Sequence, residues 1–152
     1  MMSSKNAAAA SHPRHRPYRQ IPHTADLAWR LWGEDLPKLF ENAGRALSAT
    51  LTDLRSLRRA EVRQVSLDSS DQEALLVDWL NHLLYLFDTD GFLGRDFQVN
   101  SLTGTSLTAK VTGDIFDAAR HPSKTGIKAA TYHHLEIVPE DEGWRATVVL
   151  DL

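Results

Sequence analysis

The chain has 152 residues, of which 42% are hydrophobic and 24% are charged, and its formal net charge is −3. This length and composition are typical of one soluble globular domain, long enough to bury roughly 68–70% of the surface of its unfolded chain. Because the sequence contains no cysteine, disulfides, zinc–thiolate sites, iron–sulfur clusters and cysteine nucleophiles are excluded. The lack of cysteine fits a reducing compartment, and no apolar run is long enough to cross a bilayer.

The charge is distributed unevenly along the chain. Before Asp26 the sequence has four basic residues and no acidic one. From Asp26 onward it has the remaining 13 of the 17 Lys and Arg and all 20 of the acidic residues. An acidic body argues against a free-standing nucleic-acid binder, because phosphate binding depends on neutralising cations. It favours instead a metal or a basic protein partner.

The chain begins with a basic lead, residues 1–17, which has no periodic apolar face and contains two prolines. These features predict disorder, so we expect a single folded domain over residues 18–152. Its first strand is predicted over about residues 18–32, where alternating apolar residues share one face. Pro22 inside this strand indicates an edge position or a bend near His23.

Two amphipathic helices are predicted next. The first begins at the N-cap candidate Asp35 and runs to about Leu51, with apolar residues at helical spacing. The second follows the capping box Ser70-Asp-Gln-Glu73 and carries one continuous apolar stripe. The stripe comprises Leu76, Trp79, Leu80, Leu83, Leu84 and Phe87.

The remaining sequence is rich in strands. One short strand is predicted between the helices, three more follow the second helix, and another ends the chain. These strands cover about residues 62–67, 96–102, 107–113, 128–138 and 144–152. Runs of adjacent strands favour antiparallel or mixed pairing. We therefore predict an α+β fold, a two-layer sandwich in which two helices cover one face of a sheet of about six strands.

The last strand carries the first candidate site. From Trp144 to Leu152 apolar and polar residues alternate, so the carboxylate of Leu152 is expected next to that of Asp151. Two such anions repel by about 4 kcal/mol at about 4 Å and an effective dielectric of about 20. A hard divalent cation would relieve this repulsion, although a solvated, frayed chain end is the simpler interpretation of this feature alone.

Asp26 and Lys128 are the other candidates on predicted strands. A strand carboxylate is uncommon unless it is solvated, paired or bound to a ligand. Asp26 is therefore either an edge residue bonded to the adjacent turn or, with Asp151 and Leu152, an oxygen ligand of a cation. Lys128 is a base, an anchor for a phosphate or carboxylate, or a lysine whose head group lies in water.

A long loop over residues 114–126 contains the last candidate, His121, directly after Arg120. This histidine is either a phosphate or metal contact or an ordinary exposed loop residue. The sequence shows no glycine-rich phosphate cradle and no nucleophile elbow.

The order of four motifs along the chain resembles the archease family. The motifs are His23-Thr-Ala-Asp26, Leu76-Val-Asp-Trp-Leu-Asn-His-Leu-Leu-Tyr-Leu-Phe-Asp-Thr-Asp-Gly-Phe92, Arg120-His121 with Gly126-Ile-Lys-Ala-Ala-Thr-Tyr-His133, and Leu150-Asp-Leu152. The resemblance extends from about Tyr18 to the last residue. It departs from the family pattern at Ala28, where many members carry glycine, and at Ala130, where valine is usual.

The resemblance implies a small cytoplasmic activator of an RtcB-type RNA ligase, one that promotes guanylylation and turnover of the ligase in tRNA splicing and RNA repair and is not itself an enzyme. It implies that Asp26, Asp151 and Leu152 bind a divalent cation, Ca²⁺ first and Mg²⁺ or Mn²⁺ as alternatives. The functional lysine of the family corresponds to Lys128, which we assign with His121 to contacts with the partner or a phosphate. RNA would be reached through the ligase, and neither DNA nor a membrane is an expected partner.

Two other functions stay open. One is a chaperone or modulator of a tRNA-modifying methyltransferase, which needs only a binding surface. The other is a stand-alone metal-dependent hydrolase that uses Lys128 and His121. A hydrolase with one metal generally needs an open coordination position with a base nearby.

Overall fold

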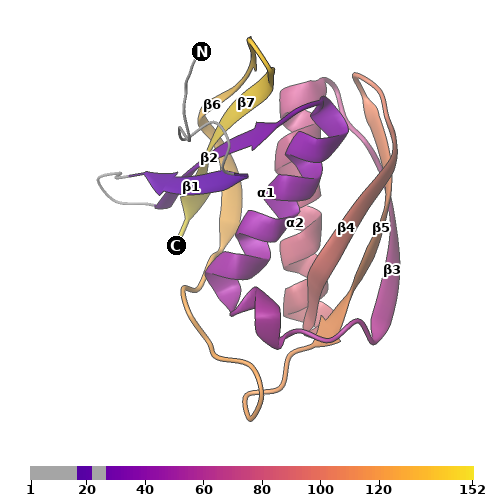
Figure 1. The fold of residues 1–152 in the computed structure, drawn as a ribbon, viewed down its shortest axis with the longest axis vertical. Coiled ribbons are helices and arrows are strands. Elements are labelled where there is room, and N and C mark those ends of the chain that lie inside the picture. Colours follow the sequence, from indigo (N-terminus) through magenta and orange to yellow (C-terminus); the bar gives the residue numbers. More distant parts are fainter. Residues whose placement is uncertain (1–16, 22–26) are drawn as a thin grey trace.

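The computed structural model describes residues 17–21 and 27–152. Two sheets enclose two helices, which gives three layers (Figure 1). In chain order the elements are β1 (Tyr18–Ile21), β2 (Leu27–Gly33), α1 (Leu36–Leu51), the 3-10 helix η2 (Leu54–Ser56), β3 (Glu61–Asp68), α2 (Gln72–Asp90), β4 (Phe92–Leu102), β5 (Ser106–Ile115), β6 (Ala129–Glu140) and β7 (Gly143–Asp151). The strand pairs are antiparallel, and the predicted α+β class is confirmed.

The first predicted strand is divided into two. β1 pairs with β2 so that Tyr18 lies opposite Leu31, and the residues between these strands, 22–26, lie outside the described part of the chain. β2 also pairs with β7, and β7 pairs with β6, which gives a four-stranded sheet in the order β1-β2-β7-β6. In this sheet, called sheet A, the final strand of the chain is the neighbour of β2.

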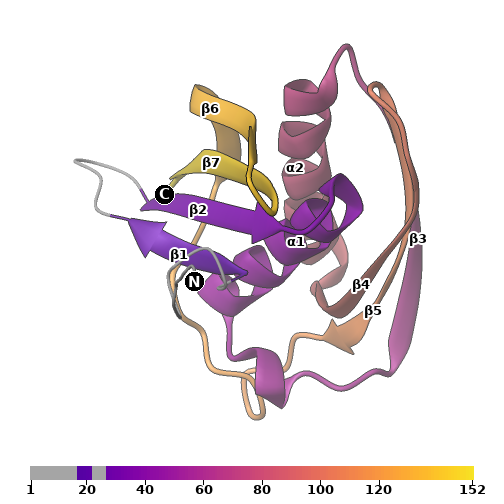
Figure 2. The ribbon, with the colours of Figure 1, turned by 45° about the horizontal axis from the view of Figure 1, so that its top comes forward.

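The other strands form a second sheet, sheet B, in the order β3-β5-β4. α1 contacts both β2 and β4, and α2 contacts both β6 and β4, so the helices lie between the sheets (Figure 2). The single sheet of the prediction is thereby corrected to two. The reason lies in α2, where Leu75 (0% exposed) and Val77 (2% exposed) are buried although both lie off the predicted stripe. A helix that is apolar around most of its circumference needs cover on more than one side.

Aspartate side chains cap the N-termini of both long helices. Asp35 accepts from the backbone N–H of Lys38 at 2.8 Å, as predicted. At α2 the cap is Asp71 rather than Ser70, and it accepts from the N–H of Ala74 at 2.8 Å. Each bond satisfies one of the donors that the first turn of a helix leaves unpaired.

Trp79 joins the layers at the centre of the core. It is fully buried, its Nε1 donates to the carbonyl of Phe40 in α1 at 2.9 Å, and its ring packs edge-on against Phe97 of β4 at 6.2 Å between centroids. One side chain of α2 thus holds α1 and sheet B together.

Among the described residues, neither helix is both long and apolar enough to cross a membrane.

Candidate functional site

The end of sheet A at which β7 finishes brings three predicted site residues together. Asp151 lies opposite Ala129, and the backbone N–H of Lys128 donates to the carbonyl of Asp151 at 2.7 Å. Lys128, Asp151 and Leu152 are all exposed, and we name these three residues the strand-end tip. The tip therefore brings a carboxylate, backbone oxygens and an amine to one end of sheet A, each on an exposed residue.

Asp26, the remaining predicted cation ligand, lies outside the described residues, and its position stays a prediction. Its neighbour in the chain, Leu27, is described and lies opposite Leu150 in the pair of β2 with β7. The start of β2 and the end of β7 are therefore at the same end of sheet A, beside the C-terminus in Figure 2.

An asparagine of α2 holds β6 next to the tip. The Asn81 Oδ1 accepts from the backbone N–H of Ala130 at 2.8 Å, and its Nδ2 donates to the carbonyl of the same residue at 3.2 Å. Since β6 is the edge strand of sheet A, the side-chain amide takes the place of a neighbouring strand. Ala130 is two residues from Lys128, so α2 positions the tip through this contact.

We expect replacement of Asn81 by alanine to lower the free energy of unfolding by about 1–2 kcal/mol, because the pair of hydrogen bonds to Ala130 is lost. Urea denaturation measures this loss, and hydrogen exchange at the Ala130 amide should accelerate. The matched control is Asn100→Ala at an exposed position of β4, which should change neither. Equal effects of the two substitutions would contradict this role of Asn81.

His121 is buried, which corrects its assignment to an exposed loop contact. Its side chain is fully covered, its Nδ1 accepts from the backbone N–H of Asp117 at 2.8 Å, and its Nε2 lies 3.1 Å from Oδ2 of Asp114. Because Nδ1 is an acceptor, the ring proton resides on Nε2 and is donated to Asp114. His121 therefore ties the loop that precedes Lys128 to the end of β5 and is not presented to a partner or a phosphate.

Asp114 is the acceptor at the centre of this buried cluster. It also accepts from Nη1 of Arg120 at 3.2 Å and from the backbone N–H groups of Arg58 at 3.0 Å and Ile115 at 2.9 Å. Burial by itself would raise the pKa of the Asp114 carboxyl, but the hydrogen bonds from Arg58, Arg120 and Ile115 outweigh it and lower the pKa below its ordinary range. The cluster is thus built around a charged carboxylate.

The described residues supply only part of the predicted cation site. Within residues 17–21 and 27–152, no three His, Cys, Asp or Glu side chains are grouped so as to hold a metal ion. The strand-end tip contributes one carboxylate side chain, that of Asp151, together with backbone oxygens. The prediction of a cation site therefore depends on Asp26.

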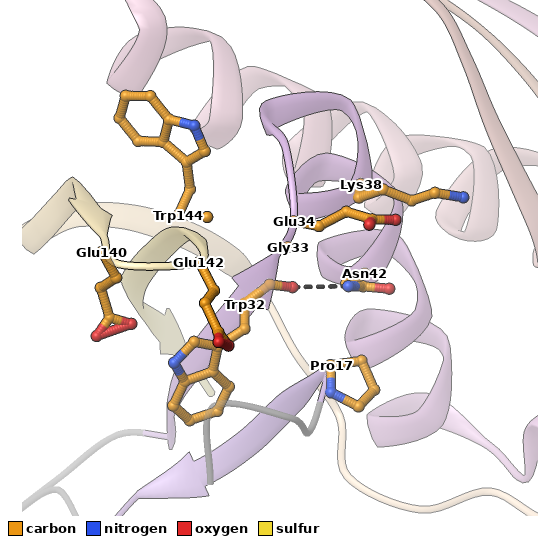
Figure 3. A pocket seen from close by; sticks show the side chains of 10 residues that line it. Pro17, Trp32, Gly33, Glu34, Lys38, Asn42, Glu140, Glu142 and Trp144 are labelled. Atoms are coloured by element: carbon orange, nitrogen blue, oxygen red, sulfur yellow. Dashed lines mark hydrogen bonds between the residues drawn. The ribbon is translucent and has the colours of Figure 1, made fainter. Parts of the chain in front are cut away.

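A cavity at the opposite end of sheet A was not predicted from the sequence. It has a volume of about 440 Å³, and its lining includes Trp32, Glu34, Asn42, Glu140, Glu142 and Trp144 (Figure 3). The Asn42 amide donates to the carbonyl of Trp32 at 2.6 Å. The turn between β6 and β7 closes the cavity, and its Gly143 (φ 147°) approaches β2 so closely that a Cβ would lie 2.2 Å from the carbonyl oxygen of Gly33. The sequence signals this turn, but only the strand pairing places it beside β2.

The chain is a small α+β protein in which two antiparallel sheets enclose two helices. The model of the Archease protein family matches residues 18–152. The chain is 38% identical over 139 residues to protein archease of Methanosarcina barkeri, covering 89% of this chain and 95% of that protein. It is 35% identical over 139 residues to protein archease of Methanopyrus kandleri, covering 90% of this chain and 99% of that protein. The chain belongs to the archease family.

Solved structures agree with this assignment. The solution structure of Methanobacterium thermoautotrophicum protein 1598 has a TM-score of 0.77 and 34% identity, covering 90% of this chain and 99% of that chain. The crystal structure of an archease from Thermotoga maritima, described as a possible chaperone, has a TM-score of 0.64 and 22% identity, covering 88% of this chain and 96% of that chain. The second comparison concerns the fold alone.

Proposed function

We propose that this protein is a metal-binding activator of an RtcB-type RNA ligase, and that it promotes guanylylation and turnover of the ligase in tRNA splicing and RNA repair. Membership of the archease family supports this proposal. The observation that carries it is the strand-end tip, where the exposed Asp151 and Lys128 are adjacent. In this proposal the protein acts in the cytoplasm, has no catalytic turnover of its own, and reaches RNA through the ligase.

The proposed cation ligands are Asp26, Asp151 and Leu152. All of their donor atoms are oxygens, which Ca²⁺ prefers and which Mg²⁺ and Mn²⁺ also accept. Leu27 lies opposite Leu150. The residues that adjoin Asp26 and Asp151 in the chain are therefore cross-strand partners, which supports a shared ion.

The residues of the tip have separate roles in this proposal. A cation held by Asp26, Asp151 and Leu152 would supply positive charge that stabilises phosphate oxygens. Lys128 contacts a phosphate or an acidic group of the ligase through its exposed ammonium group. His121 has no part in this contact because it is buried.

The test is transfer of GMP from labelled GTP to the cognate ligase, measured with and without this protein in the presence of Ca²⁺, Mg²⁺ or Mn²⁺. We expect the protein to accelerate the transfer and to sustain repeated ligation. Lys128→Ala should weaken the acceleration, whereas Lys110→Ala, an exposed lysine on sheet B, should leave it unchanged. An unchanged rate of GMP transfer, together with co-purification of a methyltransferase instead of a ligase, would reject the proposal.

A further inference from the structure

The outer face of sheet A carries three arginines at adjacent positions. Arg19 of β1 lies opposite Arg30 of β2, and Arg30 lies opposite Thr147 of β7. Arg145 lies two residues before Thr147 and so shares its face, diagonal to Arg30. These four residues are named the arginine face. Trp29, next to Arg30, belongs to the hydrophobic core, so by strand alternation the arginine face points away from the helices.

The arginine face concentrates polar atoms that lack partners. Among the described residues, five buried side-chain nitrogen or oxygen atoms have no hydrogen-bond partner. Four of them belong to this face: the Nε atoms of its three arginines and Oγ1 of Thr147. Buried polar groups are nearly always hydrogen bonded, and each unsatisfied one costs free energy. These four atoms are covered, so a ligand does not contact them directly; they show that the Nε donors of the arginine face find no acceptor among the described residues.

Among the residues that the structure describes, carboxylates form ion pairs with this face only at Arg145. Glu136 and Glu140 of β6 each lie 3.9 Å from the guanidinium of Arg145. In the described part of the chain no carboxylate forms an ion pair with Arg19 or Arg30. These two arginines face each other directly, and like charges directly opposite in a sheet are destabilising. An anion bound between them would remove that repulsion.

We propose that the arginine face binds a phosphate group, carried by an RNA strand or by a free nucleotide. Guanidinium groups present planar forks of donors that match oxyanions. The acceptor sites of a carboxylate lie in one plane, whereas the oxygens of a phosphate point in several directions around one centre and can meet guanidinium groups that come from different strands. The acidic character of the whole chain does not prevent this local binding, because charge is screened beyond about 8–10 Å at physiological salt.

This site is separate from the strand-end tip. Thr147 and Asp151 are four residues apart on β7, which corresponds to about 13 Å at about 3.3 Å per residue. The inference rests on the register of sheet A and on its unpaired atoms, so it does not depend on the proposed activation of a ligase.

The test compares Arg30→Gln with Arg55→Gln in the full chain. Arg55 belongs to η2, its side chain is 89% exposed, and it pairs with Asp53, so the control removes the same charge elsewhere. The probes are a fluorescent oligouridylate, AMP and, as a carboxylate probe, oligoglutamate. We expect Arg30→Gln to weaken oligouridylate binding about tenfold, as for loss of a charge-assisted hydrogen bond. It should also lower the slope of log affinity against log salt by about 0.7, and Arg55→Gln should change neither quantity.

The two sources of phosphate give different results. Tighter binding of oligouridylate than of AMP identifies an RNA strand as the source of the phosphate. Equal binding of both identifies a free nucleotide. Either result supports the site if the binding is weakened in Arg30→Gln. Equal losses in Arg30→Gln and Arg55→Gln, or binding of oligoglutamate as tight as that of oligouridylate, would overturn the inference.

A thermal measurement separates binding from folding. Because Arg30→Gln relieves the repulsion with Arg19, the Tm of the variant without ligand should equal or exceed that of the original chain, while the rise in Tm on addition of AMP should be lost. Arg19→Gln on the edge strand β1 should behave in the same way. A fall in Tm without ligand in both variants would assign the arginines a structural role and count against the site.

Discussion

Replacing Asp151 with asparagine should lower the affinity for divalent cations by more than about tenfold and abolish stimulation of ligase guanylylation. Asparagine has nearly the same size but no charge, so it removes electrostatic attraction without removing the side chain. Loss of groups that merely orient metal ligands already costs about 10–100-fold in affinity, so loss of Asp151, a cation ligand in the proposed function, should cost at least as much. Asp151 is exposed and ends β7, so the fold should be unaffected. Calorimetric titration with Ca²⁺ and Mg²⁺ measures the affinity, and GMP transfer measures the stimulation.

The matched control for this experiment is Asp141→Asn. Asp141 is exposed in the turn between β6 and β7, at the opposite end of sheet A, and its substitution changes the net charge by the same amount. We expect it to retain cation binding and stimulation. Full stimulation by a folded Asp151→Asn protein would remove the basis of the proposed mechanism, whereas loss in both variants would indicate an effect of overall charge.

The position of Asp151 could be predicted because it depends on local properties of the chain. Strict alternation from Trp144 to Leu152 defines a strand, and the structure confirms it as β7. The helix stripe around Trp79 has the same local origin and is likewise confirmed. Alternation says which residues share a face, but it does not say which strand lies beside which.

The division into two sheets required information that the stripe of α2 does not contain. Leu75, Val77 and Leu86 are buried off that stripe, and together with the stripe residues they cover much of the helix circumference. Read as a whole, this breadth indicates a helix packed on two sides. Which strands form each layer still depends on long-range pairing. The pairing of β2 with β7, for example, joins residues that are more than 100 positions apart in the sequence.

His121 and the arginine face also could not be predicted from the sequence, because their neighbours are set by the folded chain. The sequence places His121 in a loop, and only the folded loop carries it inward to Asp114. Arg19, Arg30 and Arg145 form no motif along the chain, because they become neighbours only through the register of three strands. Sites assembled across strands are thus less accessible to sequence reasoning than sites within one strand.

The buried cluster around Asp114 should dominate the acid sensitivity of the fold. The pKa of Asp114 in the folded protein lies below its ordinary value of 3.8. Its contribution to stability is therefore fully present above about pH 4 and is lost as the pH falls through the lower, folded-state pKa. Protonation in that range neutralises the acceptor on which the His121 ring and the Arg120 guanidinium converge.

Asp114→Asn should lower the free energy of unfolding at pH 7 by roughly 3 kcal/mol. Oδ2 of Asp114 accepts from three donors, the N–H of Arg58, Nη1 of Arg120 and Nε2 of His121, whereas Oδ1 accepts from one. An amide has one oxygen, so either orientation leaves buried donors facing an NH₂ group, which is as costly as breaking a buried ion pair. Urea denaturation across the acid range measures the difference between the two proteins.

That difference should shrink below about pH 4, because the original chain then loses the charge that asparagine never had. Asp141→Asn, which changes an exposed carboxyl, should follow the original chain at every pH. A difference that stays constant across the acid range would show that Asp114 contributes by packing and not by charge.

Since the loop after Asp114 leads through His121 to Lys128, a variant with a loosened cluster should also stimulate the ligase less, even though its tip residues are intact.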